Sequence, residues 1–426
     1  MRQHGPSGEV FIAVETRERL SVQPRKPHDL RLVGFTCDPL QPACDTPSLH
    51  PLTPSGPVVI ATSANDVALL PSMALRAGPL GRELRLVHRL LVEPDCDGNG
   101  TPAWEEPFGS VRHKGNGIAE TVWNTSVGFV ETNVIQQNTP GLGLASCIKR
   151  GVSYSEIRNG RLWTCFTVEP ASGVCDIACG SRPHGGAWST SILPNLGDNN
   201  QDHLWFQFVP NAEPSVNDRV VAHHMEDPGT EVHSIRSRFI DRVGEPSVFM
   251  DPVLHLNNKV NWPSNERTTD GLLAQVWREW PVSGTDPSLL RYAKCDLLAD
   301  DCEDPASWVV STLHGPARSV QHPEIMSDGA LQVIAFSDDP TLGPGEDRVR
   351  VMHSCDSGDT WTAPITVFAP ALSGHTVGME YGRPHIVLDR TNQRIHVAVV
   401  SSDTAKIEES TTGGVFWVTR PYPACL

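Results

Sequence analysis

The stretch that decides the fold is HSCDSGDTWTAP, His353 to Pro364. Within it, Ser, Asp, Gly, Thr and Trp follow the spacing S-x-D-x-G-x-T-W over Ser354–Trp361. An Asp side chain can accept hydrogen bonds from N–H groups of its own turn, Gly adopts backbone conformations closed to other residues, and Trp can pack beneath a hairpin. The motif therefore predicts a stapled turn between two strands.

Copies of this motif recur along the chain. DRVVAHHMEDPGTEV (Asp218–Val232) aligns without gaps with DRVRVMHSCDSGDTW (Asp347–Trp361), which places Asp227 on Asp356 and Gly229 on Gly358. The weaker copies are Ala43–His50, Asp95–Trp104, Ser181–Trp188, Asp301–Trp308 and Ser410–Trp417. Such internal duplication predicts a repeat domain whose units are small antiparallel sheets.

Composition supports this interpretation and excludes several classes of partner. The 35 Gly and 36 Pro are spread along the chain, which is typical of many short strands joined by turns. No apolar run reaches the length of a membrane span. With 50 acidic residues, 34 basic ones and no basic run, a nucleic acid or an anionic membrane is a poor partner.

Two cysteine pairs indicate the compartment. Cys37 and Cys44, and likewise Cys295 and Cys302, share the pattern C-D-x5-C-[DE]-x-P, which predicts two hairpin disulfides and an oxidising compartment. Zinc binding is the alternative, although neither pair has the tight C-x2-C spacing. The N-terminal residues show no signal peptide. We therefore expect an extracellular or periplasmic protein that is either a mature form or exported by another route.

The repeated motif resembles the Asp-box of the sialidase (neuraminidase) superfamily, in which the box joins the third and fourth strands of a propeller blade, on the outer rim. The resemblance implies an all-β fold, a six- or seven-bladed β-propeller of four-stranded antiparallel blades. It also implies one domain over residues 1–426, with an insertion around 105–180. In this interpretation the motif itself is structural, and the ligand site lies elsewhere.

A second repeat, x-P-x-[IV], indicates where the site lies. It occurs as EPSV, HPEI and RPHI, and in this family such segments begin the innermost strand of a blade. The resemblance therefore implies that Glu245, His322 and Arg383, each before the Pro, face one axial cavity. Glu324 and His385, each after the Pro, are further candidates for substrate binding. An acid, an imidazole and a guanidinium around one opening suit a polar ligand.

The resemblance also suggests catalytic residues. Sialidases use a Tyr nucleophile with a Glu, and the segment MEYGRP supplies Glu380 and Tyr381, with Glu245 as a further carboxyl group. The chain departs from the family, because the position of the nucleophile is Arg383 and the first blade lacks Arg-Ile-Pro. Two hypotheses follow: a secreted glycosidase acting on terminal sugars such as sialic acid, or a non-catalytic propeller that binds glycan or protein through its axial face.

One segment has the spacing of a calcium loop. In DCDGNGTPAWEE, Asp95, Asp97, Asn99 and Glu106 occupy positions 1, 3, 5 and 12, with oxygen ligands suited to a hard cation. The alternative is a lengthened copy of the motif turn, since Pro102 interrupts the usual pattern. We expect a glycan or glycoconjugate partner and no required cofactor, with bound calcium as one of the two alternatives for this segment. The sequence leaves the oligomeric state open.

Overall fold

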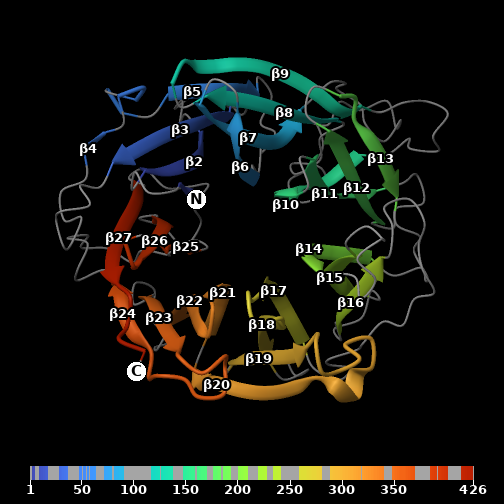
Figure 1. Cartoon of the computed structure of the whole chain (residues 1–426), viewed down its shortest axis with the longest axis vertical. Coiled ribbons are helices and arrows are strands. Elements are labelled where there is room, and N and C mark those ends of the chain that lie inside the picture. The colour runs from blue at the N-terminus through green and yellow to red at the C-terminus, as the bar shows by residue number, and fades with distance from the viewer. Residues whose placement is uncertain are drawn as a thin grey trace, which may run out of the picture. The chain divides into compact units, whose positions relative to one another are not determined.

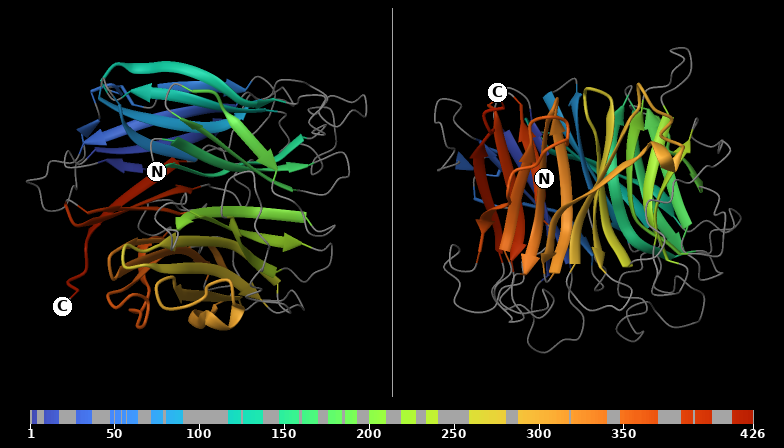
Figure 2. Two further views of the ribbon diagram at one scale, coloured as in Figure 1. Left: turned by 45° about the vertical axis from the view of Figure 1, so that its right-hand side comes forward. Right: turned by 90° about the horizontal axis from the view of Figure 1, so that it is seen from below.

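The computed structural model shows an all-β chain in the residues it describes, with one short 3-10 helix, η1 (Pro305–Ser307) (Figures 1 and 2). None of the helical structure in those residues is long and apolar enough to cross a membrane. The described residues are 2–4, 9–17, 28–36, 48–49, 51–53, 55–56, 58–63, 72–78, 81–90, 117–124, 126–137, 147–158, 161–169, 176–183, 186–192, 200–209, 219–227, 234–240, 259–280, 288–317, 319–339, 348–369, 384–390, 392–401 and 414–425.

The chain divides into two compact units, and the first comprises Met1–Asp38 and Thr46–Leu204. Its described residues form three antiparallel sheets. The first contains β1 (Arg2–His4), β2 (Glu9–Arg17), β3 (His28–Thr36), β4 (Ser48–Leu49) and β5 (Val58–Ser63); the second β6 (Ser72–Gly78), β7 (Gly81–Leu90), β8 (Gly117–Asn124) and β9 (Gly128–Gln137); and the third β10 (Cys147–Arg158), β11 (Arg161–Glu169), β12 (Asp176–Pro183) and β13 (Ser189–Ile192).

The second unit comprises Pro39–Asp45 and Trp205–Leu426. Its sheets are again antiparallel, with strands in chain order. They are formed by β14 (Asn200–Val209), which straddles the unit boundary, β15 (Arg219–Asp227) and β16 (Ser234–Ile240); by β17 (Lys259–Arg267), β18 (Leu272–Trp280), β19 (Ser288–Asp296) and β20 (Val309–Ala317); by β21 (Ser319–Asp328), β22 (Leu331–Asp339), β23 (Arg348–Ser354) and β24 (Ile365–Phe368); and by β25 (His385–Asp389), β26 (Arg394–Ser401) and β27 (Gly414–Pro421).

Successive sheets of the second unit pack face to face (Figure 2). The apolar run Val333–Phe336 of β22 is fully buried, because one face of that strand meets the β17–β20 sheet and the other meets β25–β27. Burial of one such aliphatic or aromatic side chain contributes about 1.5–3 kcal/mol. This packing sets first strands side by side, so that β21 lies between β17 and β25 (Figure 1).

The first unit buries charge as well as apolar side chains. Glu120 of β8 is fully buried and lies 2.6 Å from Arg85 and 3.0 Å from Arg182, while Arg85 also contacts Glu83 at 2.6 Å. Burial by itself lowers the pKa of Arg85, but the hydrogen bonds and charge of Glu120 and Glu83 outweigh it and raise that pKa. Two acids and two arginines neutralise one another here, which gives this network a structural role.

The predicted turn over Ser354–Trp361 joins β23 and β24, the third and fourth strands of their sheet. Asp356 staples it: the carboxylate accepts hydrogen bonds from Thr360 N at 2.8 Å, Thr360 Oγ1 at 2.6 Å and Ser354 Oγ at 2.7 Å. These bonds, led by those from Thr360, lower the pKa of Asp356 to about 2. The stapling role that the sequence predicted for this Asp is confirmed.

The Gly and the Trp of the turn also act as predicted. Gly358 has φ +84°, a left-handed conformation that favours glycine. A Cβ on it would lie 2.1 Å from Tyr292 Oη of the neighbouring sheet. Trp361 Nε1 donates to Gly358 O at 3.2 Å, and its ring meets the Tyr292 ring edge-on at 5.2 Å. The turn therefore fits against the next sheet as well as closing its own hairpin.

The weaker copies have three different outcomes. Asp301–Trp308, between β19 and β20, and Ser181–Trp188, from the end of β12 to the start of β13, also connect third to fourth strands. The copy Ser410–Trp417 was wrong, because Trp417 lies inside β27 and pairs with Ala398 instead of closing a turn. Asp95–Trp104 and most of Ala43–His50 lie outside the described residues. The number of blades therefore stays a prediction.

Of the predicted disulfides, Cys295–Cys302 is confirmed and Cys37–Cys44 lies outside the described residues. A further disulfide, Cys355–Cys425, joins the motif turn to the segment after β27, with 70 residues of separation. The single-domain prediction with an insertion around 105–180 stays a prediction. In that range the described residues 117–124, 126–137, 147–158, 161–169 and 176–180 belong to strands of two sheets and their turn.

Candidate functional site

The candidate site lies on the first strands of adjacent sheets in the second unit, where each strand carries a proline. In β21, Gln321 pairs with Ser337 and Glu324 with Ala335, so three steps on β21 oppose two on β22. The extra residue forms a β-bulge at His322-Pro323, and His322 has φ +47°. A non-glycine residue in this region costs about 1 kcal/mol or more and marks a constrained site.

The same bulge occurs in β17, at a place that the sequence pattern missed. There Asn261 pairs with Arg278 and Ser264 with Val276, so that Trp262-Pro263 corresponds to His322-Pro323. The segment W-P-S-N escaped the pattern x-P-x-[IV] because its fourth residue is Asn. Ser264 in β17, Glu324 in β21 and His385 at the start of β25 are thus equivalent residues that follow a proline.

Glu324 and His385 form the chemically most informative pair. Glu324 Oε2 lies 3.0 Å from His385 Nδ1, an ion pair whenever the imidazole is protonated. The Glu324 side chain is 7% exposed, whereas the His385 side chain is 46% exposed. A buried carboxylate therefore lies against an imidazole that solvent and a ligand can reach, and imidazole exchanges protons near neutral pH.

A second carboxylate–imidazole pair in the same sheet shows why exposure matters. Asp389 Oδ2 lies 3.8 Å from His396 Nε2, and His396 Nδ1 lies 3.0 Å from Thr419 Oγ1. Burial raises the pKa of Asp389, but hydrogen bonds from His396 and Asn392 outweigh it and lower that pKa. Both Asp389 and His396 are sealed in the interior, so this pair cannot meet a ligand.

Two other buried carboxylates are neutralised by arginine. Glu279 of β18 lies 2.8 Å from Arg291 Nε, and Asp338 of β22 lies 3.1 Å from Arg350 Nε, at corresponding places in neighbouring sheets. Asp338 is also 3.5 Å from His314. These acid–arginine pairs tie second strands to third strands, which suits a structural role more than proton transfer.

Neighbouring strands hold β21 in place around the pair. Ile325 N donates to Ser264 Oγ of β17 at 3.3 Å, and Ser327 Oγ donates to Glu266 of β17 at 3.1 Å. From the other side, Arg390 donates to Ser327 O at 3.2 Å. Both bonds to β17 join residues 61 apart, and Glu324 and His385 differ by the same number, 385 − 324 = 61.

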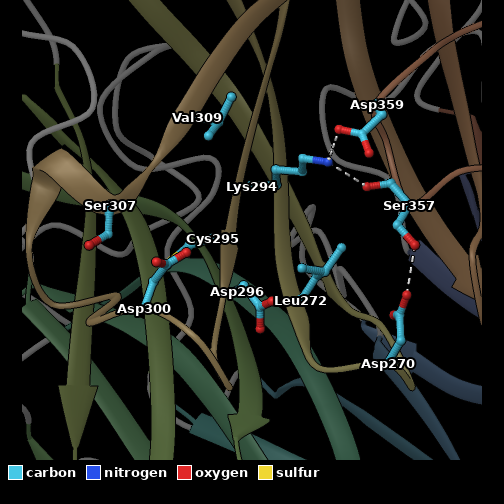
Figure 3. Close-up of a pocket in the computed structure, with 10 residues that line it drawn as sticks. All are labelled: Asp270, Leu272, Lys294, Cys295, Asp296, Asp300, Ser307, Val309, Ser357 and Asp359. Carbon is cyan, nitrogen blue, oxygen red and sulfur yellow. Dashed lines mark hydrogen bonds and ion pairs between the residues drawn. The ribbon is translucent and has the colours of Figure 1, made fainter.

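An open pocket of about 370 Å³ lies elsewhere in the second unit, beside the motif turn (Figure 3). Four aspartates and one lysine line it: Asp270, Asp296, Asp300, Asp359 and Lys294. Lys294 Nζ donates to Asp359 at 2.6 Å and to Ser357 O at 3.1 Å, and Ser357 Oγ donates to Asp270 at 2.7 Å. These bonds join the turn to the neighbouring sheet, so we assign the pocket a structural role.

The hydrogen bonds and the lysine charge in this pocket change the pKa of Asp270. Burial raises its pKa, but hydrogen bonds from Thr268 and Ser357 together with the charge of Lys294 outweigh that effect, and the pKa is lowered. The carboxylate therefore stays ionised at neutral pH, where it can accept the Ser357 hydroxyl proton in a hydrogen bond.

Some of the predicted site residues lie in the part of the chain that the structure describes, and others lie outside it. Glu324 of β21 contacts His385 of β25, and His322 lies two residues before Glu324, in the bulge of β21. Glu245, Glu380, Tyr381 and Arg383 lie outside the described residues, as do the calcium candidates Asp95, Asp97, Asn99 and Glu106. Their predicted roles stay predictions. In the part of the chain that the structure describes, no group of three His, Cys, Asp or Glu residues is arranged to bind a metal ion.

The environment of Tyr292, a described tyrosine of this unit, does not suit a nucleophile. Tyr292 is buried, donates to Gln332 Oε1 at 2.8 Å and packs beneath the motif turn. Burial raises its pKa, which disfavours the phenolate that attack on a sugar needs.

Comparisons with known proteins found distant structural likenesses. No protein-family model matches the chain, and no curated protein sequence matches it. An alpha-L-arabinanase of Penicillium chrysogenum is 11% identical, with a TM-score of 0.48, 82% of this chain covered and 92% of that one. An alpha-L-arabinofuranosidase of Fusarium graminearum is 14% identical, with a TM-score of 0.44 and coverage of 64% and 83%. An endo-arabinase of Bacteroides thetaiotaomicron is 11% identical, with a TM-score of 0.37 and coverage of 66% and 93%. At this level of similarity they assign neither a family nor an activity.

Proposed function

We propose that the chain is a secreted, carbohydrate-active β-propeller that hydrolyses glycans at the Glu324–His385 pair. Support for the propeller comes from antiparallel sheets in chain order, first strands set side by side and contacts that recur at 61 residues. The motif turn, which resembles an Asp-box, supports it further. The disulfides Cys295–Cys302 and Cys355–Cys425 support an oxidising compartment.

The observation that carries the enzymatic proposal is the buried carboxylate of Glu324 against a half-exposed imidazole. A protonated His385 stabilises the ionised form of Glu324, which suits Glu324 to the role of base or nucleophile more than that of acid. Glycoside hydrolysis needs a second carboxyl group as the acid, about 5–10 Å away. Glu245 and Glu380, on segments that precede β17 and β25, are the proposed sources of that second group.

Sialic acid is one substrate among several for this site. The chain departs from the sialidase pattern at Arg383, and Tyr292 is committed to packing; Tyr381, beside Glu380 in the sequence, is the proposed nucleophile of a sialidase. A neutral pyranose or furanose needs only the pair of carboxyl groups. The substrate panel must therefore include both kinds of sugar.

The test measures release of the aryl group from hexopyranosides, pentofuranosides and sialosides. If one class is hydrolysed, Glu324→Gln should lower kcat by about 1,000-fold and His385→Asn by about 100-fold, with the fold kept by circular dichroism. Asp356→Ala, in the motif turn, is the control and should leave kcat unchanged. Hydrolysis that survives Glu324→Gln would show that the site lies elsewhere.

The second candidate function is glycan binding without catalysis. It is favoured by the exposed imidazole of His385, which can form a hydrogen bond with a sugar hydroxyl without the second carboxyl group that hydrolysis needs. Retention on an oligosaccharide column that is lost in His385→Asn, with no hydrolysis of any aryl glycoside, would support binding over catalysis.

A further inference from the structure

We propose that Ser264 is a positioning residue for Glu324, acting through the backbone of β21. This inference rests on the glycan-hydrolysing function proposed above. Ser264 lies on a different strand and a different sheet from Glu324, and its bond goes to the residue next to Glu324.

The need for such a residue follows from the place of β21 in its sheet. As a first strand, β21 pairs with β22 along one edge, and the amides of the other edge must find acceptors elsewhere. Ile325 N, directly after Glu324, finds its acceptor in Ser264 Oγ at 3.3 Å, and Ser264 and Ile325 are both fully buried. Water cannot replace an acceptor that is lost there.

Because of the bulge in β21, the bond from Ile325 N to Ser264 Oγ helps to fix the position of Glu324. The regular pairing of β21 with β22 is interrupted between Gln321 and Glu324, so the ladder fixes the Glu324 backbone on only one side of the residue. The Ser264 bond supplies a second restraint, from the neighbouring sheet. A misplacement of about 1 Å in a catalytic group can cost up to 100-fold in rate.

The equivalent residues of neighbouring sheets also connect Ser264 to Glu324. Ser264, Glu324 and His385 each follow a proline, and each of the first two reaches the next first strand: Ser264 to Ile325 of β21, and Glu324 to His385 of β25. The contacts form one chain across three strands, and the catalytic pair is its last link. A disturbance at Ser264 is therefore transmitted to Glu324.

The experiment compares Ser264→Ala with Ser288→Ala. Ser288 is the matched control, because its buried Oγ accepts a bond at 2.6 Å from Val320 N, which is on the same strand but lies before the bulge that precedes Glu324. Each variant leaves one buried β21 amide without its acceptor, so both should lower Tm by a few degrees. Only Ser264→Ala should lower kcat, by about 10-fold, with KM changed less than twofold. Equal effects of both variants on kcat would overturn the proposal.

A readout without activity separates this proposal from the proposed function. The titration midpoint of the His385 imidazole, followed by NMR and identified with His385→Asn, reports its contact with Glu324. Ser264→Ala should shift the midpoint by about 0.5 pH unit towards that of Glu324→Gln, and Ser288→Ala should not. If no glycoside is hydrolysed, the proposed function fails but the midpoints still decide: an unchanged midpoint in Ser264→Ala overturns the role of Ser264.

Discussion

The turn after β19 and the turn after β23 occupy the same place in neighbouring sheets, and each joins a third strand to a fourth. The first is closed by the disulfide Cys295–Cys302, and Trp308 Nε1 donates to Cys302 O at 3.0 Å. The second is closed by hydrogen bonds to Asp356, and Trp361 Nε1 donates to Gly358 O. In both, the indole nitrogen binds a carbonyl oxygen of its own turn.

The difference lies in what the cysteines do. Cys295 and Cys302 are buried and bond to each other, so this disulfide links no other part of the chain to the turn. Cys355 instead bonds to the exposed Cys425, beyond the last strand, so its turn also anchors the neighbouring sheet. Equivalent turns can thus be closed by a covalent bond or by hydrogen bonds, and only the second kind leaves a cysteine for a long-range link.

The largest expected effect concerns these two disulfides. A disulfide stabilises the fold by lowering the entropy of the unfolded chain, and this effect grows with the logarithm of the loop length. The double variant Cys355→Ser with Cys425→Ser should therefore lower the free energy of unfolding by about 4 kcal/mol. The double variant Cys295→Ser with Cys302→Ser should lower it by about 2 kcal/mol. Chemical denaturation of both double variants measures the difference. If the short-loop variant loses more stability, burial of the sulfur atoms outweighs the loop-length effect.

The next effect concerns the close approach at Gly358. Gly358→Ala should lower the free energy of unfolding by about 3 kcal/mol, because the new methyl group would overlap Tyr292 and the left-handed backbone would be strained. Gly271→Ala is the matched control, since Gly271 has φ +97° but its Cβ would meet the flexible Leu298 side chain at 3.0 Å. It should cost about 1 kcal/mol. Equal losses of stability in the two variants would show that backbone strain alone sets the cost and that the Tyr292 side chain moves aside.

The third effect is a pH dependence confined to the second turn. The pKa of Asp356 is about 2 in the folded chain, against about 3.9 when unfolded, so the unfolded state binds more protons between these values. The contribution of Asp356 is therefore complete above about pH 4 and is lost as the pH falls towards 2.

Asp356→Asn should cost about 1 kcal/mol at pH 7, since the partly exposed Asp is screened by solvent, and much less at pH 2.5, where its contribution is mostly lost. Asp304→Asn in the first turn, whose carboxylate accepts one bond from Ala306 N, provides the comparison and should cost less. Thermal unfolding between pH 2.5 and 7 measures both. A constant cost of Asp356→Asn across this range would contradict the assigned hydrogen bonds.

The smallest effect concerns the link of the second turn to the neighbouring sheet. Lys294→Gln removes the ion pair with the exposed Asp359 and one bond to Ser357 O, and should cost less than 1 kcal/mol. The cost should fall further in 1 M salt, as measured by denaturation at both ionic strengths. A larger, salt-independent cost would show that the bond to Ser357 O dominates.

Local features of the fold were predictable from the sequence because neighbouring residues carry them. Ser354, Asp356, Gly358 and Trp361 lie within eight positions, and their side-chain chemistry is enough to define a turn. The spacing of Cys295 and Cys302 within one hairpin likewise predicted their disulfide. The copy Ser410–Trp417 shows the limit, since Gly and Trp without the Asp occur both in the turn of Ser181–Trp188 and, at Trp417, inside a strand.

The candidate site was predictable in part. The residues His322, Glu324 and His385 were identified through a shared proline, which marks the bulge where a first strand changes direction. The equivalent segment of β17 was missed, because the pattern required an apolar fourth residue and β17 has Asn265 there. The pairing register of β17 with β18 identified this segment, because a bulge depends on pairing with the next strand and not on one residue type.

By itself, the sequence determined the all-β class, the stapled turn at Asp356 and the bond between Cys295 and Cys302. These depend on a few residues that stay close together in any conformation of the backbone. Only the tertiary structure decided that Glu324 meets His385, that Ser264 holds Ile325 and that Cys355 joins Cys425. Each of these contacts spans about one repeat of the chain, so it forms only when neighbouring sheets pack face to face and bring equivalent strands together.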